Sequence, residues 1–240
     1  MINIKKLLNL RHYCYISDTK VETLYQQIHT LGKSRASVEW GVDLKVFKAG
    51  GKFEHETEDS RDDKLKAVLK ALRDNGLVGT VDDPKAYIAG IYTMRFGTLR
   101  DWGRPPESSP LIYFGGRTEK TMFGLGGSSK HVIENGGQGS TDARSSSPAI
   151  IGEILRGMTA STDGWRIRAS VEEGDTFETF DAVKWANNNL KIYPEVQLEF
   201  CAKVLHTGRA KDMEGGEVRA LLGSPLYVAH VDPPDFSYLQ

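Results

Sequence analysis

The sequence predicts an α+β fold, with a mixed, mostly antiparallel sheet and helices packed on it. Segments with the two-residue apolar period of strands alternate irregularly with segments that have the longer period of helices. Several expected strands follow one another closely enough to form hairpins, and no internal repeat is evident. This order argues against a regular βαβ array, in which a helix separates each strand from the next.

The N-terminal segment predicts a strand, a helix and a hairpin. Residues 12–17 mix aromatic and apolar side chains as strands do, and Asp18 opens a stretch whose apolar residues recur at the spacing of an amphipathic helix. Residues 38–47 alternate between apolar and polar, and the glycine pair that follows predicts a turn into residues 52–56. Because this second arm is charged, we expect it at an edge of the sheet.

A second helix is expected after Ser60. Ser60 and Asp63 have the spacing of a partial capping box, in which side chains bind the free N–H groups of the first helical turn. One face of the segment carries the apolar residues Leu65, Val68, Leu69 and Leu72. Asn75 and Gly76 predict the end of the helix, because glycine readily takes the left-handed conformation found there.

Three segments in the middle of the chain predict the centre of the sheet. Residues 86–96, 111–114 and 121–125 are apolar or aromatic at successive positions, which is typical of strands covered on both faces. Residues 126–147 contain five glycines and six serines and lack the apolar side chains that a packed segment needs. We expect a loop there, with a flexible part at residues 132–147.

The C-terminal part predicts two helices, three strands and a charged loop. The helices are expected to begin after Ser147 and near Asp175, whose side chains suit a helix N-terminus, and the second should end at the asparagines 187–189. The strands are expected at residues 165–171, 196–204 and 226–231, with the charged loop at residues 208–217. Residues 196–204 also fit a helix, but their strict alternation favours a strand.

Composition argues against several classes of protein. The 240 residues include 31 Lys and Arg against 32 Asp and Glu, without a basic run, so nucleic acid is not an expected partner. No apolar stretch approaches the ~18 residues of a membrane helix, and no secretory signal is evident, so no membrane association is expected. Cys14 and Cys201 suggest neither a disulfide framework nor a zinc motif. We expect a cytoplasmic protein.

The densest candidate for a binding site is the glycine-rich segment after residue 125. Glycines let backbone N–H groups converge on an anion, and the serines and the lysine that follow add donors. If residues 111–114 and 119–125 form an antiparallel hairpin, the loop 97–110 reaches the same end of the sheet, whereas Arg117 lies at the turn, about 20 Å away. The expected ligand-binding residues are Arg100, Trp102, Arg104, Gly126, Gly127, Ser128, Ser129, Lys130 and His131.

Known motifs do not assign a reaction to this segment. Counted from Gly124, the P-loop pattern fails at Ser129 and His131, and the dinucleotide fingerprint lacks its third glycine. No serine stands in the pattern of a nucleophile elbow, and no histidines have metal-ligand spacing. We predict no catalytic residue and no metal ligand, and the cofactor is unknown. The glycines also have a structural interpretation, as a tight hairpin and a loop.

Five motifs occur in order along nearly the whole chain: Tyr15-Ile-Ser-Asp-Thr-Lys-Val21, Leu77-Val-Gly-Thr-Val81, Tyr113-Phe-Gly-Gly-Arg117, Gly124-Leu-Gly-Gly-Ser-Ser-Lys-His131 and Leu222-Gly-Ser-Pro-Leu-Tyr-Val228. Together they resemble an uncharacterised bacterial domain family of unknown function. The resemblance implies a sensor or adaptor of a bacterial conflict or defence system rather than a metabolic enzyme, and it implies no catalytic residues. Its coverage favours one domain over residues 1–240.

We therefore expect a cytoplasmic ligand-sensing or signalling domain that binds an anionic, nucleotide-like small molecule and passes its state to a protein partner. Ordering of residues 132–147 on binding would provide the switch. Two alternatives stay open. One is an interaction module without a ligand, in which Trp102, Phe236 and Tyr238 contact a protein partner. The other is an enzyme acting on a phosphorylated substrate through Lys130 and His131.

Overall fold

The computed structural model describes residues 11–34, 59–98, 111–133, 154, 179–211 and 217–231. Backbone contacts divide the chain into two compact units. One unit comprises Asp18–Val78 and contains two helices; the other comprises Met1–Ser17 together with Gly79–Gln240 and contains a sheet and helix α5. Helices accompany a mixed, mostly antiparallel sheet, so the α+β class expected from the sequence is confirmed.

Helices α1 (Asp18–Ser34) and α2 (Arg61–Asp74) form the helical unit. The α2 helix begins as its capping residues predict, since Ser60 Oγ accepts a hydrogen bond from the Asp63 amide at 3.2 Å. It ends before Gly76, whose φ of 64° lies in the left-handed region. The buried face of α2 consists of Leu65, Val68, Leu69, Ala71 and Leu72.

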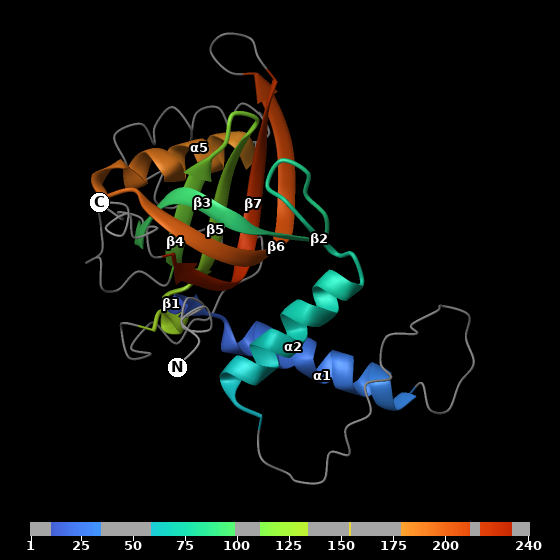
Figure 1. Ribbon diagram of the computed structural model, residues 1–240. Coiled ribbons are helices and arrows are strands. Elements are labelled where there is room, and N and C mark those ends of the chain that lie inside the picture. The colour runs from blue at the N-terminus through green and yellow to red at the C-terminus, as the bar shows by residue number, and fades with distance from the viewer. Residues whose placement is uncertain are drawn as a thin grey trace, which may run out of the picture. The chain divides into compact units, whose positions relative to one another are not determined.

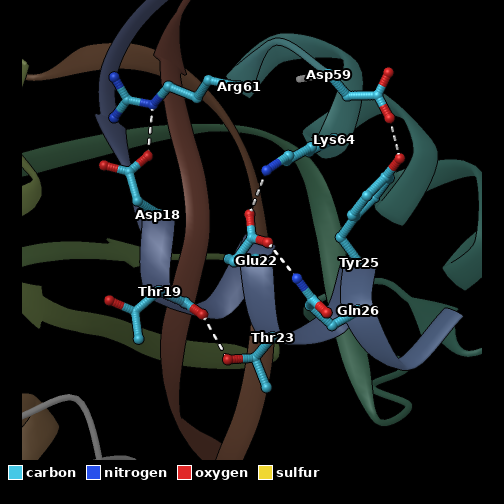
Figure 2. A network of polar contacts seen from close by, with 9 residues as sticks. All are labelled: Asp18, Thr19, Glu22, Thr23, Tyr25, Gln26, Asp59, Arg61 and Lys64. Carbon is cyan, nitrogen blue, oxygen red and sulfur yellow. Dashed lines mark hydrogen bonds and ion pairs between the residues drawn. The ribbon is translucent and has the colours of Figure 1, made fainter. Parts of the chain in front are cut away.

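Ion pairs connect the first turns of the two helices (Figure 2). Arg61 Nε lies 2.6 Å from Asp18 Oδ1, and Lys64 Nζ lies 2.7 Å from Glu22 Oε2. The hydrogen bond from Lys64 lowers the pKa of Glu22, because it stabilises the charged carboxylate. These pairs are largely exposed, so each contributes little to stability, but together they fix which faces of α1 and α2 meet.

Seven strands form one sheet, and five of them pair into a closed ring (Figure 1). The seven strands are β1 (His12–Ile16), β2 (Val78–Gly79), β3 (Tyr87–Thr98), β4 (Leu111–Arg117), β5 (Thr121–Ser128), β6 (Val196–Lys211) and β7 (Glu217–His230). The ring runs β3–β4–β5–β7–β6 and returns to β3, and only the β5–β7 pair is parallel. Strand β1 pairs with β7, and β2 ends the strand order beside β3.

Side chains alternate between the inside of the ring and its outer face. Ile112, Phe114 and Phe123 belong to the cluster that fills the inside, whereas Leu111 and Tyr113 belong to a second cluster on the outer face. Helix α5 (Thr179–Asn189) contributes Ala182, Val183 and Ala186 to this second cluster and lies across the strands, as Figure 1 shows. The β4 and β5 strands are therefore covered on both faces, as their apolar sequences predict.

Two glycines of β5 make room for tyrosine rings. A Cβ on Gly124 would overlap the ring of Tyr113 on the outer face, and a Cβ on Gly127 would overlap the ring of Tyr15 on the inside. Both tyrosines are 0% exposed, so neither ring can move aside into solvent. These glycines therefore allow the strand to pack closely on both of its faces.

Most of the expected elements that fall within the described residues are confirmed. The confirmed strands are those expected at residues 12–17, 86–96, 111–114, 121–125, 196–204 and 226–231, and the confirmed helices are α1, α2 and α5. The elements expected at residues 38–47, 52–56 and 165–171 lie outside the described part of the chain. The helix expected after Ser147 is described only at Ile154, which is helical.

Two expected loops are wrong in part. Strand β5 continues through Gly126 and Gly127 to Ser128, and the short helix η3 (Ser129–His131) follows, so no loop begins at residue 126. Residues 208–211 extend β6, and β7 already begins at Glu217, so the charged loop is shorter than residues 208–217. In both cases backbone pairing with a neighbouring strand extends the element, and this pairing needs no apolar side chains.

None of the helices in the described ranges is both long and apolar enough to cross a membrane.

Candidate functional site

The segment predicted to bind an anion lies at the end of β5. Gly126, Gly127 and Ser128 pair with the first residues of β4, and the Gly126 carbonyl accepts a hydrogen bond from Ser224 Oγ at 3.1 Å. The predicted residues that lie outside the described part of the chain are Arg100, Trp102 and Arg104. Their convergence on the end of β5 stays a prediction.

The remaining predicted residues form η3. The Lys130 amide donates to Ser128 Oγ at 3.4 Å, and the Lys130 side chain is exposed. His131 is buried, and its ring packs edge-on against Tyr15 with the centroids 6.0 Å apart. Strand pairing and packing therefore already engage this segment.

The opposite end of the β4–β5 hairpin has a different surface. The two strands are antiparallel, with Leu111 opposite Ser128 at one end and Arg117 opposite Met122 at the other. Six residues of extended strand separate the two ends, or about 20 Å. As the sequence predicted, Arg117 therefore lies far from Lys130.

A pocket with a volume of about 280 Å³ opens at this end, on the side of the sheet that α5 covers. It is lined by Thr93, Met94 and Arg95 of β3, Gly115, Gly116 and Arg117 of β4, Met122 of β5, Lys184, Asn187 and Asn188 of α5, Lys191 of the short helix η4 (Leu190–Ile192), and Glu195. All of these residues belong to the same structural unit. The pocket is thus a recess between one helix and three neighbouring strands.

Gly115 and Asn187 set the distance between α5 and the sheet. A Cβ on Gly115 would overlap Asn187 Oδ1 and lie 3.2 Å from Leu190 Cδ1. The Asn187 Nδ2 group donates to the Gly116 carbonyl at 3.2 Å and to the Phe123 carbonyl at 3.3 Å. The bare backbone of β4 therefore forms part of the pocket wall, and the helix is tied to it through one side-chain amide.

The pocket has an excess of positive charge. Of its four cationic side chains, Arg95 pairs with Glu195, with Nη2 and Oε1 2.8 Å apart. Arg117 and Lys191 are exposed, and neither has an ion-pair partner within the described residues. Like charges in a recess attract anions, because the low-dielectric walls concentrate the field in the opening.

The lining favours binding rather than acid–base chemistry. Among the described residues, the lining contains no histidine or cysteine, and its only carboxylate, Glu195, is held by Arg95. Within the described part of the chain, no three or more His, Cys, Asp or Glu side chains are grouped so that they could hold a metal ion. The described lining offers guanidinium, ammonium and amide donors, two amide oxygens and one hydroxyl group.

Sequence reasoning missed most of this pocket. It identified Gly115, Gly116 and Arg117 only as the turn of a hairpin and used the asparagines 187–189 only as a helix end. The available signal was the polar stripe of Lys184, Asn187, Asn188 and Lys191, which follow the i, i+3, i+4, i+7 spacing of one helix face. Such a stripe is also typical of an ordinary solvent-exposed face, so only the fold reveals that it faces a recess.

Comparison with known proteins identifies the family of this chain. The model of a family of unknown function (DUF7019) matches residues 11–232, so the chain belongs to this family. The match extends through both structural units and confirms the resemblance to an uncharacterised family. Comparisons with curated proteins and with solved structures found no match.

Proposed function

We propose that this protein binds a small anionic ligand in the basic pocket beside α5. The observation that carries the proposal is the recess whose described lining contains four cations, Arg95, Arg117, Lys184 and Lys191, and a single carboxylate. Four cations in one recess repel one another, so an anion that lies among them lowers the free energy of the folded state. The proposed class of function, binding of a small anionic ligand, is the one expected from the sequence. The proposed site lies at the Arg117 end of the β4–β5 hairpin and not at the Lys130 end.

The size of the pocket favours a small molecule over a polymer. A volume of about 280 Å³ lies at the lower limit of pockets that hold drug-sized ligands, and it suits one anionic group with a few further atoms. Nucleic acid would instead require cations spread over an extended surface, since it is held mainly by successive phosphates. A nucleotide-like ligand would therefore place only its phosphate end in the recess.

We further propose that ligand binding is a signal. The pocket joins α5 to β3 and β4, so an anion that bridges both sides would strengthen the contact between helix and sheet. A helix held more firmly on the sheet presents a more ordered surface to a protein partner, which is a form of disorder-to-order switching. A cytoplasmic sensor in a bacterial defence system would use the protein in this way.

Thermal and chemical unfolding of the full chain with inorganic phosphate and a panel of phosphorylated small molecules tests the binding function. A ligand at one hundred times its dissociation constant should raise the unfolding free energy by about 2.7 kcal/mol. We expect Arg117→Ala and Lys191→Ala to abolish most of this gain. Both side chains are exposed and without an ion-pair partner in the described residues, so both variants should fold normally.

Lys130→Ala is the matched control, because it removes an exposed lysine at the opposite end of the same hairpin. We expect it to leave every stabilising effect unchanged. If Lys130→Ala abolishes the effect while Arg117→Ala does not, the ligand binds at the end of β5 and the pocket proposal is wrong. If none of the three variants changes the effect, neither site is the binding site.

A further inference from the structure

We propose that Glu195 competes with the anionic ligand of this pocket: it holds Arg95 until an anion that contacts both Arg95 and Arg117 displaces it. This inference rests on the proposed function and concerns the regulation of the same site. It starts from the ion pair in the pocket lining, in which Arg95 Nη2 and Glu195 Oε1 are 2.8 Å apart. The Glu195 carboxylate occupies the place at this guanidinium that the oxygen of an anionic ligand would take.

The register of the strands places Glu195 beside Arg95. The last residues that pair β3 with β6 are Met94 and Val196. Arg95 and Glu195 come next on the two chain segments, so they occupy opposite positions just beyond this pair. Opposite positions have Cβ atoms about 5 Å apart, so the fold itself keeps the carboxylate within reach of the guanidinium. On its other side, Arg95 lies opposite Gly115 of β4, which has no side chain that could compete.

The ion pair is exposed enough to open. The Glu195 side chain is 54% exposed and the Arg95 side chain is 33% exposed. A carboxylate released from Arg95 is therefore hydrated by solvent and not left buried, and the place that it vacates can be reached from solvent. The exchange takes place at a terminal nitrogen of the guanidinium and does not involve the buried Nε. Exposed ion pairs are weak, so the closed pair exceeds the open one by no more than about fivefold.

An anion that bridges two guanidinium groups can displace a carboxylate that contacts one. Arg117 lies two residues beyond Gly115 on β4, so it is the diagonal neighbour of Arg95 on the same face of the sheet. Diagonal neighbours have Cβ atoms about 7–8 Å apart, a distance that two long side chains can span. A phosphate group has enough oxygens to accept hydrogen bonds from both arginines. The exchange therefore favours an anion with several oxygens over a simple carboxylate.

The competition lowers the apparent affinity of the pocket. A ligand that needs Arg95 binds only those molecules in which Glu195 has released it, so its dissociation constant rises in proportion to the closed fraction's excess. Because the closed pair exceeds the open one by about fivefold, removal of the carboxylate should tighten binding by about the same factor. The pair is thus an autoinhibitory contact that sets the ligand concentration at which the pocket fills.

Titration of the full chain with inorganic phosphate, followed by phosphorus NMR, tests the competition. Glu195→Gln keeps the size of the side chain and removes its charge, and we expect it to bind phosphate about fivefold more tightly than the wild type. Glu195→Asp keeps the charge, but its shorter side chain reaches Arg95 less well, so we expect it to tighten binding too. A carboxylate that only repelled the ligand would have nearly the same effect in Glu195→Asp as in the wild type.

Glu119→Gln is the matched control for the loss of one negative charge. Glu119 is exposed and lies two residues from Arg117, in the β4–β5 turn, but it does not line the pocket. Its substitution should change the affinity by less than about twofold, because exposed charges outside the recess are screened. In an Arg95→Met background, Glu195→Gln should lose most of its gain, since the group for which the carboxylate competes is absent.

The outcomes separate this inference from the proposed function. If the wild type binds phosphate and Glu195→Gln binds it no more tightly, or keeps its full gain in the Arg95→Met background, the competition is wrong and the anion-binding function stands. If neither the wild type nor Glu195→Gln binds phosphate or any of the phosphorylated small molecules, both proposals are wrong. The two Glu195 variants decide the question even if Arg95→Met does not fold, because equal affinities of Glu195→Asp and the wild type contradict the competition.

Discussion

Replacing Gly115 with alanine tests the packing that shapes the pocket. The new Cβ would overlap Asn187 Oδ1, and Asn187 cannot swing away without losing its bonds to the Gly116 and Phe123 carbonyls. Overpacking of a close contact costs about 1–3 kcal/mol, whereas alanine in a strand is favoured over glycine by about 0.5–1 kcal/mol. We therefore expect Gly115→Ala to lower the unfolding free energy by about 1–2 kcal/mol.

Gly115→Ala should no longer lower the unfolding free energy once the Asn187 side chain is shortened. In an Asn187→Ala background, the nearest atom to the new Cβ is Leu190 Cδ1 at 3.2 Å, and a small shift relieves this contact. Gly115→Ala is then expected to be neutral or to stabilise by up to about 1 kcal/mol. The interaction energy of the pair should therefore be about 1–3 kcal/mol.

Urea unfolding of the wild type, the two single variants and the double variant measures this interaction energy. The slope of the free energy against urea must stay the same in all four, so that differences in midpoint report stability. A Gly115→Ala loss of equal size in both backgrounds would refute the reasoning, because the clash with Asn187 would then not be its cause. Asn189→Ala serves as the background control, in which the full loss should persist.

Four further predictions concern stability outside the pocket. Burial raises the pKa of Tyr113, and its hydroxyl has no hydrogen-bond partner among the described residues, so Tyr113→Phe should keep the unfolding free energy or raise it by about 1 kcal/mol. Tyr227→Phe, by contrast, removes a 2.7 Å hydrogen bond to Glu199 and should lower the unfolding free energy by about 1–3 kcal/mol, and urea unfolding measures both. Ser60→Ala removes the N-cap of α2 and should lower stability by about 1 kcal/mol in the same assay, whereas Ser60→Asp should restore it. The hydrogen bond to Asp59 raises the pKa of Tyr25 to about 12. Because the pKa of Tyr25 is higher in the folded state, the hydrogen bond contributes fully to the unfolding free energy below the ordinary tyrosine pKa of about 10, and this contribution is lost as the pH rises toward 12. Tyr25→Phe lacks the hydrogen bond, so it should lose less stability across this pH range than the wild type.

Periodicity and local chemistry predicted the elements with the strongest patterns. The α2 helix has both a capping pair at Ser60 and Asp63 and a continuous apolar face, and it begins and ends as expected. Strand β4 alternates between two cores, and its uninterrupted apolar sequence predicts that both of its faces are covered. In these segments, local preference and tertiary packing favour the same conformation.

The glycines of β5 show where local reasoning fails. The sequence predicts a loop that begins at Gly126, because glycine is usually found where the backbone bends. Here Gly124 and Gly127 are required by the rings of Tyr113 and Tyr15, and the latter comes from a strand far away in the sequence. The sequence shows that these two positions have no side chain, but only the tertiary structure shows that tyrosine rings occupy the space beside them.

The net charge of the whole chain also gave no sign of the basic pocket, because a net charge does not show where the individual charges lie. A formal net charge of -1 argues correctly against a surface that binds long polyanions, since such a surface needs many more cations than anions. It does not constrain a recess formed by four cations from β3, β4, α5 and η4, because the balancing carboxylates lie elsewhere on the molecule. Exposed charges more than about 8 Å apart are largely screened at physiological salt, so an anion in this pocket responds to its own walls and not to the charge of the whole chain.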